Sequence, residues 1–202
     1  MKSMKPALIA AGLCLLLTSC IPSLNPFFTE KDLVAEPRLV GEWKAEDGSM
    51  TWSFADDGDK SFTLSVIETE KETPKSGTFS AHFFKVGNEM FLDLIPTKCE
   101  FAKEQTDLVS MAVFPGHLLA RVTSIEPQMK VQFFNWDWLQ KHLGTHPKEL
   151  AHHIENKDQI VLTAEARDMQ RFVAKHLGKD ELFGDVGVFV RSPAAPADAP
   201  TP

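Results

Sequence analysis

The sequence has no tyrosine, only three cysteines, and fewer basic than acidic side chains. Its 21 lysines and arginines stand against 28 aspartates and glutamates, which gives a formal net charge of −7. Nucleic-acid binding needs a basic surface, so this balance argues against a nucleic-acid partner. An acidic protein also gains little from electrostatic contact with anionic lipid.

Motifs typical of enzymes and cofactor sites are missing as well. The chain contains no G-x-S-x-G nucleophile turn, no phosphate-binding glycine loop and no HExxH zinc motif. We therefore expect a protein without catalytic activity, cofactor or bound metal.

The N-terminus lacks an apolar run long enough to span a membrane. Residues 7–17 are apolar and interrupted only by Gly12, whereas a spanning helix needs about 20 such residues. Lys2 and Lys5 precede the run. This pattern predicts that residues 1–19 are a secretory signal that is removed from the mature protein.

The residues at the end of this signal resemble the lipobox of bacterial lipoproteins, with Leu17, Thr18 and Ser19 ahead of Cys20. The resemblance implies that the Cys20 thiol receives a diacylglycerol, that the chain is cut before it, and that the new amine is usually acylated. Two or more acyl chains hold a protein stably on a membrane, at about 0.8 kcal/mol per buried CH₂. The alternative is an ordinary cleaved signal in which Cys20 has no role.

The residue after the cysteine is Ile21 rather than aspartate. In the lipoproteins that the motif resembles, this favours sorting to the outer membrane, so we expect a lipid-anchored protein of the bacterial cell envelope. With Cys14 removed and Cys20 acylated, only Cys99 keeps a thiol. An intramolecular disulfide is therefore not expected.

Both ends of the mature chain read as segments outside the folded domain. Residues 20–36 contain Pro22, Pro26 and few periodic apolar residues, which indicates a tether. Residues 192–202 are mostly proline and alanine and predict a disordered tail. Residues 37–191 are then one domain of ordinary size. The stretch 20–32 also resembles the start of a group of bacterial lipoproteins with no assigned function.

Within the domain, apolar residues first alternate with polar ones and later recur at helical spacing. The alternation, with turn pairs such as Asp-Gly and Gly-Asn, predicts an antiparallel up-and-down sheet that curls toward closure. Its eight expected strands are residues 39–44, 50–54, 62–66, 77–86, 90–95, 108–114, 118–125 and 129–136. A C-terminal extension then follows, with a short helix capped by Asn135 or Asp137, a strand at 160–162, an amphipathic helix at 163–178 and a last strand at 186–190.

The first expected strand contains Gly41-Glu42-Trp43, which resembles the G-x-W signature of lipocalins. In that family the tryptophan closes the bottom of an eight-stranded barrel, and the glycine permits close packing beneath it. The resemblance implies a mainly β, lipocalin-like barrel. It does not imply an activity, because function does not follow from fold.

The composition is strongly aromatic, with 15 phenylalanines and four tryptophans. Such a bias favours either a dry interior or an apolar pocket. We expect a membrane-tethered binding module for a small apolar ligand; the alternative is a solid barrel that binds another envelope protein or has a structural role. If the barrel holds a ligand, the predicted lining is Phe62, Leu64, Phe79, Phe91, Asp93, Arg121 and Phe133.

Asp93 is the polar residue of that lining, on one strand face with Phe91 and Ile95. Because buried charges find partners, we expect it to pair with Arg121 across the sheet. The alternative is an acid with a raised pKa, or a group that orients a ligand. His117 is expected to begin a strand or to contact a backbone carbonyl.

A histidine cluster comprises His142, His146, His152 and His153. The first two have the i, i+4 spacing of a helical zinc site. However, Gly144 and Pro147 are expected to interrupt the helix between and after them, and no acidic third ligand stands at a recognised spacing. We therefore predict a solvated or capping role for these histidines.

Overall fold

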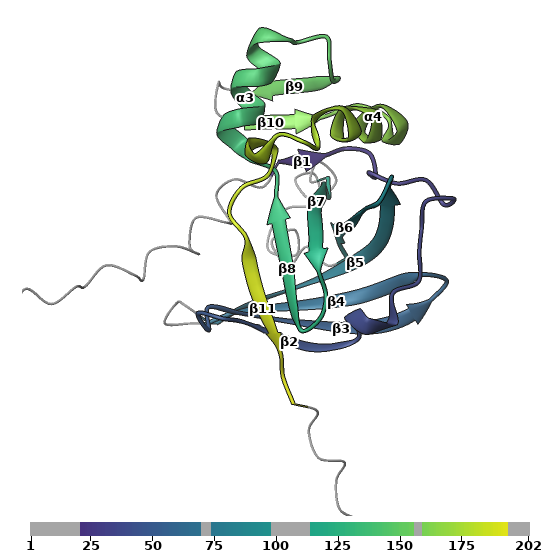
Figure 1. The fold of residues 1–202 in the computed structure, drawn as a ribbon, viewed down its shortest axis with the longest axis vertical. Helices are drawn as coiled ribbons and strands as arrows, with labels where there is room; N and C mark the ends of the chain where they lie inside the picture. Colours follow the sequence, from purple (N-terminus) through teal and green to yellow (C-terminus); the bar gives the residue numbers. More distant parts are fainter. Residues whose placement is uncertain (1–20, 70–73, 98–113, 156–158, 194–202) are drawn as a thin grey trace, which may run out of the picture.

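Eight strands close into an antiparallel barrel in the computed structural model, which describes residues 21–69, 74–97, 114–155 and 159–193 (Figure 1). Strands β2 to β8 pair in chain order, and β11 pairs with both β8 and β2 to complete the ring. The barrel strands are β2 (Gly41–Ala45), β3 (Met50–Gly58), β4 (Ser61–Glu68), β5 (Lys75–Val86), β6 (Glu89–Pro96), β7 (His117–Ser124), β8 (Gln128–Phe133) and β11 (Gly187–Arg191).

The prediction of an eight-stranded, lipocalin-like antiparallel barrel is therefore confirmed, although the membership of the ring differs by one strand. The strand expected at 108–114 falls outside the described residues except for Phe114, which is not in a strand. The ring is closed instead by β11, which inserts between β8 and β2 with Gly187 opposite Val131 and Arg191 opposite Trp43.

The tight hairpins form where the sequence carries turn residues. Gly87 has a φ of +62° at the turn between β5 and β6, a backbone conformation that glycine adopts without steric cost. The strands on either side then pair without a register shift, from Val86 opposite Glu89 to Phe79 opposite Pro96.

A layer of helices and short strands covers one end of the barrel, and we call it the cap (Figure 1). It extends the barrel sheet, since β1 pairs antiparallel with β7 and parallel with β10, and β10 pairs with β9. The predicted extension of helices and strands after residue 134 is confirmed. The cap comprises β1 (Pro22–Ser23), α3 (Trp136–Thr145), β9 (His152–Glu155), β10 (Gln159–Leu162), α4 (Ala166–His176) and the 3-10 helix η2 (Asp180–Leu182).

Residues 21–36 were predicted to be a tether, and the structure corrects this prediction. Ile21, Ser23 and Phe27 are each at most 2% exposed. The Asn25 amide donates to the carbonyl of Ala164, 3.1 Å away. The segment lacks the regular period of a strand or helix, but most of its few apolar residues pack into the cap core, so it is part of the domain.

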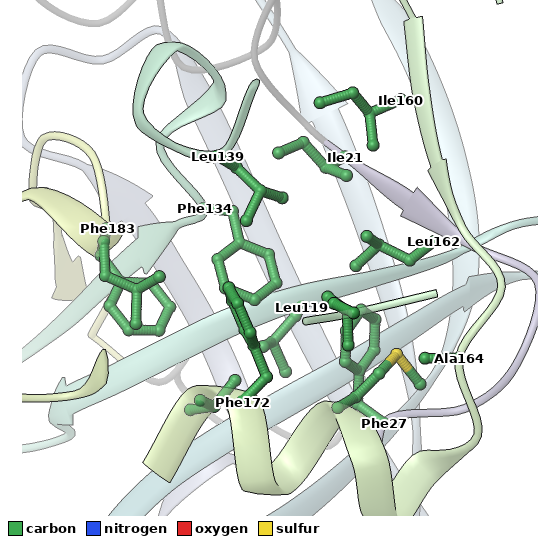
Figure 2. Close-up of a cluster of buried hydrophobic side chains, with 14 of the residues drawn as sticks. Ile21, Phe27, Leu119, Phe134, Leu139, Ile160, Leu162, Ala164, Phe172 and Phe183 are labelled. Carbon is green, nitrogen blue, oxygen red and sulfur yellow. The ribbon is translucent and has the colours of Figure 1, made fainter. Parts of the chain in front are cut away.

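The two faces of the sheet serve two separate hydrophobic cores. The barrel core lies inside the ring and includes Trp43, Phe62 and Leu92. The cap core lies between the outer face of the sheet and the cap, and Figure 2 shows it around Ile21 and Phe134. Strand β6 is buried on both faces, because Leu92 and Leu94 face the barrel core while Phe91 faces the cap core.

None of the described helices is long and apolar enough to cross a membrane.

Candidate functional site

The barrel interior, where a ligand was expected, is filled by the protein's own side chains. Trp43, Leu64, Phe83 and Met129 are completely buried within it. Four residues of the predicted lining pack into this core, namely Phe62, Leu64, Phe79 and Phe133. The other three lie elsewhere, because the alternation of the strands places them on the outer face, toward the cap; they are Phe91, Asp93 and Arg121.

Trp43, for which the lipocalin resemblance implies a barrel-closing role, is completely buried in the barrel core. Its indole Nε1 donates to the carbonyl of Leu39 at 2.8 Å. The guanidinium of Arg191 lies over the indole ring, 4.1 Å from its centroid, and donates to the carbonyl of Val40 at 2.7 Å. Sequence analysis did not identify Arg191, because no pattern near the last strand shows that the side chain of Arg191 lies over an aromatic ring.

Gly41 is required beside this stack for two reasons. Its φ of +121° lies in a region that side chains rarely adopt. A Cβ at this position would also lie 2.9 Å from Nη1 of Arg191. The glycine of the G-x-W sequence thus permits the last strand to bring its arginine over Trp43.

Asp93 is fully buried and paired, but the predicted partner is wrong. Its carboxylate accepts the backbone N–H of Phe27 at 2.8 Å and contacts Nδ1 of His117 at 2.7 Å. Arg121 pairs with Glu89 instead, and its Nη2 and Nε donate to Oε2 of Glu89 at 2.8 and 3.1 Å. His117 does begin β7 as expected, so its ring meets the carboxylate from the neighbouring strand.

His82 is the third polar residue at this point, directly opposite Asp93 in the pairing of β5 with β6. Its ring stacks on Phe28 at 4.7 Å, and its Nδ1 is buried without a hydrogen-bond partner among the described residues. Burial lowers the pKa of His82, and the nearby Asp93 carboxylate opposes that shift in part. The adjacent crevice under α4 is apolar, lined partly by Phe27 and Phe91, and too narrow for a water molecule. The Asp93 group therefore fastens the N-terminal segment to the barrel.

A second polar cluster lies where the end of α3 meets α4. His142, His146 and Glu149 each offer a ligand atom, and these atoms all lie within 4.8 Å of one another. Gly144 does not interrupt α3, which continues to Thr145, and the ring of His146 stacks on that of His142 at 4.7 Å. The helix therefore ends before His146, as expected, although one residue later than Gly144. The ring of His146 nevertheless reaches His142, and Glu149 brings an acidic group that no recognised spacing had indicated.

The other two histidines of the predicted cluster do not join it. His152 and His153 lie on β9, where Nδ1 of His152 contacts the carbonyl of Leu150 at 2.7 Å and His153 is exposed. His176 of α4 takes their place, with its Nε2 2.8 Å from Oε1 of Glu149. Sequence analysis missed Glu149 and His176; the only local signal was an acidic residue three positions after His146.

Glu149 is the centre of this cluster. Lys175 donates to Oε1 at 2.6 Å, and Nε2 of His142 lies 2.5 Å from Oε2. These contacts lower the pKa of Glu149 to about 2, with Lys175 the largest cause, followed among the lowering contacts by His176 and His142. An open groove of about 440 Å³ runs along the other side of Glu149, between residues 148–151 and α4.

Comparison of the chain with protein-family models, with curated proteins and with solved structures finds no match in any of the three.

Proposed function

We propose that this protein is a lipid-anchored lipoprotein of the bacterial cell envelope that acts through its outer surface, as a partner of another envelope protein. The observation that carries the proposal is the filled barrel. Side chains such as Trp43, Phe83 and Met129 occupy the place where a lipocalin-like ligand would sit. With the interior occupied, the outer surface and the cap are what the fold offers to a partner.

The anchoring part of the proposal rests on the lipobox residues Leu17 to Cys20. The packing of Ile21 adds a consequence for orientation. Ile21 is only 2% exposed and lies in the cap core among Leu139, Ile160 and Leu162 (Figure 2). A lipid on Cys20 would therefore be attached one residue from the cap, and the cap rather than the far end of the barrel would lie next to the bilayer.

The first test asks whether the interior can accept a ligand. Soluble protein beginning at Ile21 is titrated with a fluorescent fatty acid and with benzene, and binding is followed by fluorescence and by NMR. Phe83→Ala serves as a positive control, because truncating a buried phenylalanine opens an apolar cavity, and such cavities of about 150 Å³ bind benzene. We expect the wild type to bind neither probe and Phe83→Ala to bind benzene. Saturable fatty-acid binding by the wild type would overturn the proposal in favour of the small-ligand alternative.

The second test asks whether the outer surface has a partner. A photocrosslinking residue is placed in living cells at exposed His153 of the cap and, in a matched variant, at exposed Asp57 on the far turn of the barrel. We expect one discrete crosslinked species from one of the two positions and none from the other. Identical crosslinks at both positions, or none at either, would contradict a defined partner.

A further inference from the structure

The polar cluster at the end of α3 has the composition of a transition-metal site. Two imidazoles and a carboxylate form a set of N, N and O donors, which suits Zn²⁺ and its first-row neighbours. Calcium and magnesium prefer oxygen ligands alone, so two histidines disfavour them. The three ligand atoms, within 4.8 Å of one another, are close enough to reach one ion by changes of side-chain rotamer alone.

The histidines are held with the required nitrogens available. Trp138 stacks on His142, with ring centroids 4.6 Å apart and planes 6° from parallel, which fixes the His142 ring. Nδ1 of His146 lies 3.3 Å from the carbonyl of His142 and 2.9 Å from Oγ1 of Thr145. Because a carbonyl can only accept, Nδ1 carries the proton, and Nε2 of His146 keeps a free lone pair.

The third ligand is delivered by the turn that ends the helix. The backbone N–H of Glu149 donates to the carbonyl of His146 at 3.0 Å, which folds the chain back across the end of α3. Lys175 and His176 both contact Oε1 of Glu149. Oε2 is thereby oriented toward His142, as second-shell partners orient the ligands of metal sites.

The contact between His142 and Glu149 is one in which a metal ion can replace a proton. Nε2 of His142 lies 2.5 Å from Oε2 of Glu149, the arrangement of an N–H that donates to a carboxylate. Zn²⁺ can replace this proton if the two atoms separate to about 3.3 Å, as ligand bonds of about 2.0–2.1 Å at tetrahedral angles require. With the His142 ring fixed by Trp138, a small rotation of the Glu149 carboxylate has to provide this separation.

We propose that His142, His146 and Glu149 bind one Zn²⁺ ion, with a fourth position left for water or a donor from a partner. His176 and Lys175 act as positioning residues for the carboxylate. His146 is exposed, so an ion can reach the site from solvent on its side. The metal would then join the end of α3 to the turn that follows it, and through the contacts of Glu149 with Lys175 and His176 it would be linked to α4.

The test uses tag-free full-length protein, stripped of metal and kept in detergent. Zn²⁺, Ca²⁺ and Mg²⁺ are titrated calorimetrically, and Co²⁺ binding is followed by visible absorption, which becomes intense for tetrahedral coordination. We expect one Zn²⁺ per chain, a tetrahedral Co²⁺ spectrum, and no binding of Ca²⁺ or Mg²⁺. His146→Ala should weaken Zn²⁺ binding about tenfold or more, because it removes a direct ligand.

Controls separate a metal site from the hydrogen-bonded arrangement of the same side chains. His146 and His153 are both exposed, so His146→Ala and His153→Ala should both fold, and His153→Ala should bind Zn²⁺ like the wild type. Zn²⁺ should raise the melting temperature of the wild type and of His153→Ala but not of His146→Ala. Absence of saturable 1:1 binding, or equal binding by His146→Ala and the wild type, would overturn the proposal. Either result leaves the proposal for the filled barrel intact.

Discussion

Asp93→Ala is the substitution that most directly tests how the N-terminal segment is fastened to the barrel. The change removes the acceptor for two buried groups, the backbone N–H of Phe27 and Nδ1 of His117. A buried donor left without a partner costs about 1–3 kcal/mol, and breaking a buried polar pair costs about 3–5 kcal/mol in total. Since the free energy of unfolding of a domain is about 5–15 kcal/mol, we expect a loss of about a fifth or more of it.

The measurement is urea denaturation followed by tryptophan fluorescence, with a thermal scan beside it. For a domain of this size a loss of about 3–5 kcal/mol lowers the melting temperature by roughly 10 °C. Asp93→Asn should lose less, because the amide keeps one acceptor oxygen. A double-mutant cycle with His117→Gln should show coupling between the two positions.

The matched control uses the other acid–base pair on the same outer face. Glu89 and Arg121 are each partly exposed, so Glu89→Gln should cost only about 0.2–1 kcal/mol. A cost below about 0.5 kcal/mol for Asp93→Ala, or coupling of Asp93 to Arg121 instead of His117, would refute the reasoning.

Three further outcomes follow from the same structure. Cys20→Ser should take up no labelled palmitate and leave the signal uncleaved, whereas Cys14→Ser should behave as the wild type; acyl label in Cys20→Ser would end the lipobox proposal. Gly41→Ala should lower stability by about 1–3 kcal/mol in urea, because a Cβ meets both a φ of +121° and Arg191. Burial lowers the pKa of His82, so the unfolded chain, whose histidines titrate near 6.5, binds a proton first as the pH falls. Stability should therefore drop between about pH 7 and pH 5, and His82→Phe should flatten that slope by up to about one proton; an unchanged slope would show that His82 does not titrate as argued.

The barrel was predictable because its information is local. Strands such as β3 and β4 alternate strictly, and the turns between the strands contain residues that favour positive φ. The G-x-W sequence lies in the first barrel strand, as expected, and its Trp43 is buried in the barrel core. These signals lie within a few residues of one another, which is the range over which sequence patterns report structure.

The closing strand was not predictable in the same way. β11 is separated from β8 by the whole cap, yet it pairs with both β8 and β2. Nothing in Gly187–Arg191 alone distinguishes a barrel strand from a strand of the C-terminal extension. The predicted count of eight was reached with the strand expected at 108–114 in place of β11. The number of barrel strands was therefore right, but one of them was assigned to the wrong segment.

The burial pattern of strand β6 explains why its residues were assigned to a ligand lining inside the barrel. A barrel with one solvent-facing side alternates buried and exposed residues, but the four central residues of β6, Phe91 to Leu94, are all buried. From the sequence this run is equally consistent with lining a pocket. Only the presence of a second core shows that Asp93 points away from the barrel interior.

The two polar clusters could not be predicted from the sequence, and the physical reason is the same for both. Each depends on a residue brought from another element: Asp93 is satisfied by Phe27, 66 positions away, and Glu149 by His176, 27 positions away. Such partners cost chain entropy to bring together and are held by the packing of the cap, not by local spacing. The i, i+4 pair of His142 and His146 was visible, and Glu149 follows three positions later, but its contact with His176 of α4 could not be seen in the sequence.

The packing of the N-terminal segment changes what lipidation of Cys20 would do to the molecule. A tether would let the domain tumble freely above the bilayer, but Gln170 of α4 donates to the carbonyl of Phe27 and to Asp32, at 3.1 and 2.9 Å. The segment is thus held to α4 as well as to the barrel through Asp93. An anchor at its start would fix the cap against the membrane, with exposed Leu24 close to the attachment point. The far end of the barrel, where Arg191 covers Trp43, would then face away from the lipid, toward the compartment in which a partner is met.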